Sequence, residues 1–144
     1  MSNFNSKSVL VVEDSEEDWE ALQRALRNSP MMNIIVRCED GEEALATVNQ
    51  LVAQQHYPVF ILLDLNLPGT DGKTVLKMLK SKETLKKIPV VVFTTSTDER
   101  DINECYLLGA ESYMVKPMVF GELKEKIITL EQYWMNESSL PAYI

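Results

Sequence analysis

The sequence predicts an α/β fold in which five short buried strands alternate with five helices. Apolar runs rich in β-branched residues recur along the chain, and polar or turn residues and then a helix-like segment follow them. The runs are continuously apolar instead of alternating with polar residues, which is typical of parallel strands covered by helices on both faces. Because successive βα units connect by right-handed crossovers, we expect three layers, with helices on each side of one parallel sheet.

The predicted strands lie at residues 9–12, 34–36, 59–63, 90–93 and 113–115. Ser15 offers a hydroxyl cap to the first helix, and Glu16, Glu17 and Asp18 place acids in its first turn, where the helix dipole favours them. We expect these acids and Glu20 to serve only the helix end and solvent. The second helix is expected from 40–43 and should end before Pro58, and the third is expected after 70–72. The fourth is expected after 97–100 and should end near Gly109, and the fifth should begin near Met118.

Composition limits the classes of function. The 144 residues, 45% apolar and 25% charged, suit a single domain over 1–144, with a core of 7–135 and a short apolar tail at 136–144. The net charge of −8 argues against nucleic acid and anionic membranes as partners. Without an apolar stretch of membrane-spanning length or a signal-peptide pattern, we expect a cytoplasmic protein, in which Cys38 and Cys105 are packing thiols.

A flavodoxin-like strand order of 2-1-3-4-5 is the interpretation that best fits five consecutive βα units. In such folds the loops after the carboxyl ends of the strands form the binding crevice. Every predicted strand except the second delivers a polar or charged group to that edge: Glu13 and Asp14, Asp64 and Asn66, Thr94, and Lys116. Functional residues are therefore expected to converge there.

Three carboxylates and one ammonium in one crevice indicate a metal site and phosphoryl chemistry. Like charges so close together cost free energy unless a cation intervenes, and oxygen ligands favour a hard ion such as Mg²⁺. Asp64, beside a metal, a lysine and a hydroxyl, is equipped to accept a phosphoryl group as a carboxylate nucleophile. Lys116 would neutralise charge on the transferring group, and Thr94 would donate a hydrogen bond to one of its oxygens.

At these positions the sequence resembles the receiver domains of two-component response regulators, over about residues 7–130. The residues that carry the resemblance are Glu13-Asp14, Asp64 within the segment 64–72, Thr94, and the segment 113–117. Each is weak alone, but together and in this order they are specific. Two positions depart from the commonest pattern, since Glu13 stands in place of the more usual aspartate and Leu67 in place of a frequent methionine.

The resemblance implies a role for each matching residue. Asp64 would receive phosphate from a phosphohistidine on a sensor histidine kinase. Asp14, Asp64 and the backbone carbonyl of Asn66 would bind Mg²⁺, with Glu13 helping through water, while Lys116 would bind phosphate. The Lys116–Pro117 peptide bond would be cis. Thr94 and Tyr113 would form the switch pair, and the two positions that tune dephosphorylation in the family are Asn66 and Ser96.

Within the family, the sequence resembles the small stand-alone regulators paired with cyanobacterial and bacterial phytochromes. The similar segments are 91–96, 101–102 and 108–113, with Tyr133-Trp134 and Leu140-Pro141 near the end of the chain. This resemblance implies a phytochrome as the sensor kinase. Because few residues follow the fifth helix, we expect no fused output domain. In receiver domains the fourth helix, fifth strand and fifth helix form the output and dimer surface, and surplus apolar residues lie at the end of the last helix and in the tail, so we expect a homodimer through this end.

Two other functions remain open from the residues alone. A haloacid-dehalogenase-type phosphatase also uses a strand-end aspartate, Mg²⁺ and a lysine, but it needs a second aspartate where this chain has Asn66. A pseudo-receiver adaptor that is never phosphorylated would not need Asp64, Thr94 and Lys116 together. We therefore expect a phosphorylatable switch that modifies itself at Asp64, turns over no metabolite, and acts by binding another protein.

Overall fold

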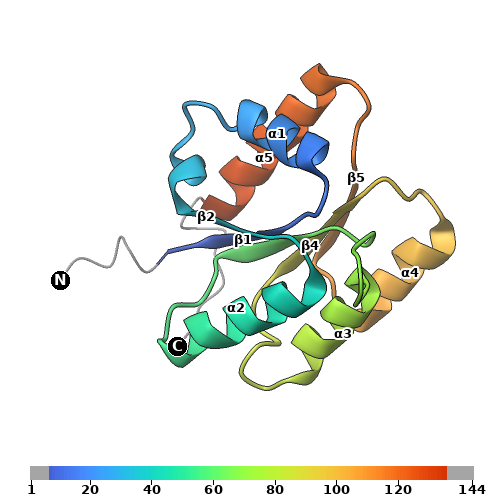
Figure 1. Cartoon of the computed structure of the whole chain (residues 1–144). Coiled ribbons are helices and arrows are strands. Elements are labelled where there is room, and N and C mark those ends of the chain that lie inside the picture. Colours follow the sequence, from blue (N-terminus) through green and yellow to red (C-terminus); the bar gives the residue numbers. More distant parts are fainter. Residues whose placement is uncertain (1–6, 136–144) are drawn as a thin grey trace.

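The structure is a computed structural model that describes residues 7–135. Its centre is one parallel sheet with the strand order β2-β1-β3-β4-β5, as predicted (Figure 1). In chain order the strands are β1 (Val9–Val12), β2 (Ile35–Cys38), β3 (Phe60–Leu63), β4 (Val90–Thr94) and β5 (Ser112–Val115). All residues of β1, β3 and β4 are buried, which agrees with their continuously apolar sequences.

Helices cover both faces of the sheet and make the three predicted layers. Figure 1 shows α1 and α5 on one face and α2, α3 and α4 on the other. The helices are α1 (Glu16–Ala25), α2 (Gly41–Ala53), α3 (Gly72–Ser81), α4 (Glu99–Leu108) and α5 (Phe120–Met135), and a short 3₁₀ helix, η2 (Pro30–Ile34), precedes β2. Among the described residues, no helix is both long enough and apolar enough to cross a membrane.

Two hydrophobic cores, one on each face, hold the layers together. The core under α2 and α3 contains Val75, Leu76 and Leu79 against the sheet residues Ile61 and Leu63. The core under α1 and α5 contains, among others, Leu26, Phe60, Ile127 and Trp134. The ring centroids of Phe60 and Trp134 lie 5.8 Å apart, so the last turn of α5 is packed on the sheet.

The element boundaries differ from the predicted ones by a few residues. α2 ends at Ala53, shortly before the segment 56–58 that was predicted to terminate it, because Gln55 takes a left-handed conformation (φ 63°) and the His56 N–H bonds back to the Leu51 carbonyl. α4 ends as predicted, at Gly109, whose φ of 109° suits glycine. Both cysteines are buried and free, as expected. The predicted apolar tail, 136–144, lies outside the described residues.

Candidate phosphoryl-acceptor site

Backbone pairing carries the first residue after each strand to the same edge of the sheet. The Glu13 N–H bonds to the Cys38 carbonyl after β1, and the Asp64 N–H bonds to the Val12 carbonyl after β3. The Lys116 N–H likewise bonds to the Thr94 carbonyl. These bonds extend the sheet ladder by one step, so the side chains that follow the strands are held by the sheet instead of by mobile loops.

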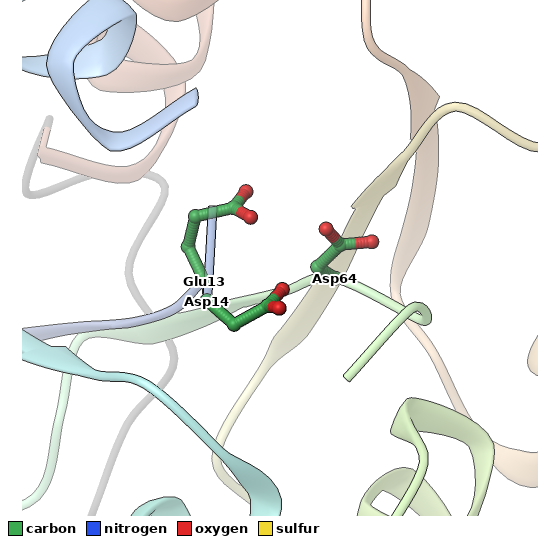
Figure 2. A group of neighbouring side chains, drawn as sticks. All are labelled: Glu13, Asp14 and Asp64. Atoms are coloured by element: carbon green, nitrogen blue, oxygen red, sulfur yellow. The ribbon is translucent and has the colours of Figure 1, made fainter. Parts of the chain in front are cut away.

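Three carboxylates gather at this edge. Oxygen atoms of Glu13, Asp14 and Asp64 lie within 4.8 Å of one another, and Figure 2 shows the three carboxylates turned toward the same space. Glu13 and Asp64 are buried and Asp14 is exposed. A set of oxygen ligands with two buried carboxylates fits a hard divalent cation, because such a cation would offset the repulsion between them.

Lys116 joins two of these carboxylates to a fourth acid. Its Nζ lies 2.6 Å from Glu13 Oε1, 2.8 Å from Asp64 Oδ2 and 2.8 Å from Asp18 Oδ2. Burial lowers the pKa of Lys116, but the hydrogen bonds to Asp18, Asp64 and Glu13 outweigh it, so the pKa is raised and the ammonium is retained. The side chain of Lys116 is 8% exposed, so its charge is placed beside Asp64 with little competition from water.

At Glu13, burial shifts the pKa in the opposite direction. Desolvation raises the pKa of Glu13 to about 7, although the hydrogen bond from Lys116 opposes that shift. The Ser15 N–H also bonds to Glu13 Oε2, at 3.2 Å. Glu13 therefore gains or loses its proton near neutral pH, and a cation at this site must compete with that proton.

Thr94 ends β4 with a buried hydroxyl that has no partner. Its side chain is completely buried, and Oγ1 makes no hydrogen bond within residues 7–135. Buried polar groups are nearly always paired, so an orphaned hydroxyl at this edge is a feature to be explained.

The loop after β4 connects Thr94 to Tyr113. The Tyr113 hydroxyl donates to the Ser96 carbonyl at 3.0 Å, and the Tyr113 side chain packs against the core under α2 and α3. The Ser96 hydroxyl donates to Asp101 Oδ2 at 2.5 Å, which fixes the loop to α4. Ser96, two residues after Thr94, thus links this loop to both Tyr113 and α4.

The segment after Asp64 is held close to α3. The exposed Asn66 uses its backbone N–H to donate to Asp64 Oδ1 at 3.1 Å. Gly72, the first residue of α3, approaches so closely that an added Cβ would lie 2.4 Å from the Asp64 carbonyl oxygen and 2.5 Å from Leu65 Cα. Only glycine permits this contact, so α3 begins directly against the backbone of Asp64.

The structure corrects two predictions about the site. The Lys116–Pro117 bond is trans, since residues 7–135 contain no cis peptide bond. Trans is the intrinsically favoured isomer of an X–Pro bond, and Lys116 reaches the carboxylates with it. Asp18 does more than complement the helix dipole of α1, because its carboxylate pairs with Lys116.

The other predicted site residues come together. Glu13, Asp14, Asp64 and Lys116 lie in one cluster through the contacts above. Thr94 pairs through the sheet backbone with Lys116, and Ser96 and Tyr113 bond to each other. Asn66 contributes a backbone N–H, and its side chain makes no hydrogen bond in the described part of the chain.

Comparison with known proteins agrees with this geometry. The family "Response regulator receiver domain" matches residues 9–128. "Response regulator Rcp1" from Synechocystis sp. is 37% identical over 138 residues, which cover 94% of each chain. The crystal structure of the phosphorylated cyanobacterial phytochrome response regulator RcpA has a TM-score of 0.84 at 40% identity, covering 94% of this chain and 98% of that one. The Mn²⁺-bound form of Rcp1 has a TM-score of 0.83 at 37% identity, covering 94% and 99%.

These relatives belong to a family with a known signalling chemistry. Receiver domains are phosphorylated on an aspartate and bind a divalent metal, and phytochrome-related regulators imply a sensor kinase as partner. The acidic cluster of Glu13, Asp14 and Asp64 lies at the carboxyl edge of the sheet, where folds of this kind place their binding sites. The chain is a response regulator with a receiver domain, related to the regulators of phytochromes.

Proposed function

We propose that Asp64 is the phosphoacceptor of this chain and that a sensor histidine kinase is the donor. The observation that carries the proposal is the contact between buried Asp64 and the Lys116 ammonium, beside two further carboxylates. An Asp64 oxygen would attack phosphorus while the bond from phosphorus to the donor histidine nitrogen breaks. The imidazole leaves with a proton and the acyl phosphate remains on Asp64.

The residues around Asp64 have separate tasks in this reaction. Lys116 neutralises charge on the transferring group, and the Thr94 hydroxyl donates to one of its oxygens, because phosphoryl transfer depends mainly on positioning and electrostatics. Mg²⁺ is the cation we propose, with Asp14, Asp64 and the Asn66 carbonyl as ligands and Glu13 helping through water. When bound, it would neutralise further charge on the phosphoryl oxygens.

Thr94 and Tyr113 are the proposed switch pair. A hydrogen bond from Thr94 to the phosphoryl group would pull on the end of β4, and the loop that follows carries the Ser96 carbonyl bonded to the Tyr113 hydroxyl. Asn66 and Ser96, on the two loops beside Asp64 and Thr94, are the proposed positions that tune dephosphorylation. Asn66 also disfavours the dehalogenase-type phosphatase, which needs an aspartate there.

One experiment tests the acceptor directly. The chain is incubated with acetyl phosphate and Mg²⁺, and intact mass spectrometry measures the phosphoryl adduct. We expect one labile adduct that disappears in Asp64→Asn, with Asp14→Asn as a variant that removes a metal ligand but keeps the nucleophile. An adduct that persists in Asp64→Asn would refute Asp64 as the acceptor. No adduct on the native chain would refute phosphorylation itself and favour an adaptor.

We further propose a phytochrome as the cognate kinase, since regulators of phytochromes match nearly the whole chain. Phosphotransfer from a phytochrome kinase and from unrelated histidine kinases is compared at equal concentrations. A faster initial rate from the phytochrome is expected, and equal rates would contradict the pairing. The cytoplasm is the proposed location, because two buried free thiols suit a reducing compartment.

A homodimer through α4, β5 and α5 is also proposed. A cavity of about 590 Å³ opens between β5 and α5, with Met114, Leu130, Tyr133 and Trp134 in its lining. Tyr133 is 58% exposed, although Trp134 beside it is buried. The test is sedimentation of a chain that ends at Met135, which keeps Trp134 in the core. We expect a monomer, and an unchanged dimer would exclude a role for residues 136–144.

A further inference from the structure

Asp18 supplies a carboxylate that contacts Lys116 from outside the acidic cluster. Its Oδ2 lies 2.8 Å from Lys116 Nζ, and its side chain is 44% exposed. The other two acceptors of the ammonium, on Glu13 and Asp64, have side chains that are 7% and 6% exposed. Asp18 therefore holds the ammonium from the solvent side, and the other two hold it from the buried side.

The start of α1 fixes the place of Asp18. The Asp18 N–H donates to the Ser15 hydroxyl oxygen at 3.2 Å, which is the helix cap. The Ser15 N–H in turn donates to Glu13 Oε2 at 3.2 Å. Arg37 ties the same turn to β2, because it donates to the Glu13 carbonyl and pairs with Glu16 at 2.7 Å. The Asp18 carboxylate is thus presented to Lys116 by a turn that is itself anchored to the site.

The three acceptors of Lys116 are not equivalent once a cation is present. An ammonium has three N–H donors, and in this structure they reach Glu13, Asp18 and Asp64, one each. Glu13 and Asp64 also belong to the cluster that suits a divalent cation, whereas Asp18 does not. A cation and Lys116 therefore compete for two of the acceptors, and Asp18 is the acceptor left to the lysine alone.

We propose that Asp18 is a positioning residue for phosphoryl transfer to Asp64. It keeps the Lys116 ammonium beside the acceptor while a cation binds Asp64 and, through water, Glu13, so that the ammonium is available to an oxygen of the incoming phosphoryl group. This inference rests on the proposed function. It gives Asp18, an acid in the first turn of α1, a part in phosphoryl transfer to Asp64.

The first test measures Mg²⁺ affinity by titration calorimetry, without a phosphodonor. Asp18→Asn removes one negative charge and weakens the bond to Lys116. Glu17→Gln is the matched control, because Glu17 is an exposed acid of the same turn with no ion pair in the described part of the chain. Loss of one charged hydrogen bond frees Lys116 to compete for Glu13 and Asp64, so we expect Asp18→Asn to raise the Mg²⁺ Kd about fivefold more than the control does.

A double-mutant cycle distinguishes positioning from a general effect of charge or folding. In a Lys116→Met background there is no ammonium to hold, so Asp18→Asn and Glu17→Gln are expected to raise the Mg²⁺ Kd equally. An equal effect of the two variants in the native background would overturn the proposal. So would a difference between them that persists without Lys116.

The second test measures the initial rate of acyl phosphate formation from acetyl phosphate at saturating Mg²⁺. We expect Asp18→Asn to lower the limiting rate about tenfold and Glu17→Gln to stay within about twofold of the native chain, as loss of one charge-assisted hydrogen bond predicts. A native chain that forms no adduct would refute the proposed function. A native chain that forms it, with Asp18→Asn as fast as Glu17→Gln, would refute the role of Asp18 alone.

Discussion

The orphaned hydroxyl of Thr94 predicts that removing it stabilises the unphosphorylated protein. The side chain is 0% exposed, and Oγ1 has no partner among residues 7–135. A buried hydroxyl without a hydrogen bond costs about 1–3 kcal/mol, and a buried methyl group contributes about 0.8 kcal/mol in the other direction. Thr94→Val replaces this hydroxyl by a methyl group at nearly constant side-chain volume. Because some relaxation offsets the gain, we expect the free energy of unfolding to rise by about 1–2 kcal/mol.

The assay is urea unfolding without Mg²⁺ or phosphodonor, with the shift of the midpoint converted through the common slope. Thr95→Val is the matched control, since Thr95 follows directly and is exposed to water. That substitution is expected to change the free energy of unfolding by less than about 0.5 kcal/mol. A Thr94→Val chain that is less stable than the native one would show that the hydroxyl has a partner, and it would refute the argument.

The same substitution should impair phosphorylation. Valine cannot donate to a phosphoryl oxygen, and one charge-assisted hydrogen bond contributes about 1.5–3 kcal/mol, so acyl phosphate formation should slow at least about tenfold. Stability and function would then change in opposite directions at one buried atom. A rate equal to that of the native chain would remove Thr94 from the reaction.

Three further predictions concern the neighbouring residues. Because burial raises the pKa of Glu13 to about 7, its deprotonated fraction rises from about one-tenth at pH 6 to about nine-tenths at pH 8. Calorimetry should therefore show the Mg²⁺ affinity rising about tenfold over that range, and a pH-independent affinity would contradict this prediction. Without a cation, the free energy of unfolding should fall as the pH rises from about 4.5 to 7, since only the folded state then holds the extra proton. Gly72→Ala should lower the free energy of unfolding, measured by urea unfolding, by about 1–3 kcal/mol, because the added Cβ would lie 2.4 Å from the Asp64 carbonyl oxygen. Gly121→Ala is the control, since open space surrounds Gly121, and it should be neutral or stabilising in the same measurement. Tyr113→Phe removes one hydroxyl hydrogen bond and should cost about 0.5–1.5 kcal/mol by the same measurement, and no cost would show that the bond is absent in solution.

Most of the site was predictable because parallel strands end at the same edge of a sheet. Lys116 and Glu13 are 103 residues apart in the chain, yet their side chains meet at 2.6 Å. Each directly follows a buried apolar run, and the order 2-1-3-4-5 brings those runs together. The apolar runs and their polar ends were therefore enough to predict the cluster before any distance was known.

Asp18 was the residue that this reasoning missed. Its place in the first turn of a helix gave a sufficient local explanation, since helix dipoles favour acids there. Its contact with Lys116 depends on how α1 is packed against the sheet and on the cap at Ser15. Sequence spacing alone does not encode that orientation, because Glu17 lies in the same turn and is exposed to water.

The strand order, the three layers and the members of the carboxylate cluster followed from patterns along the chain, because burial of both sheet faces demands continuous apolar strands and leaves polar groups only at their ends. Three-dimensional packing was needed for the rest: the trans bond before Pro117, the unpaired Thr94 hydroxyl, and the sharing of Lys116 among three carboxylates. These features depend on distances of a few ångströms between side chains from different elements. Such distances arise only when the layers are packed together, so no local pattern can predict them.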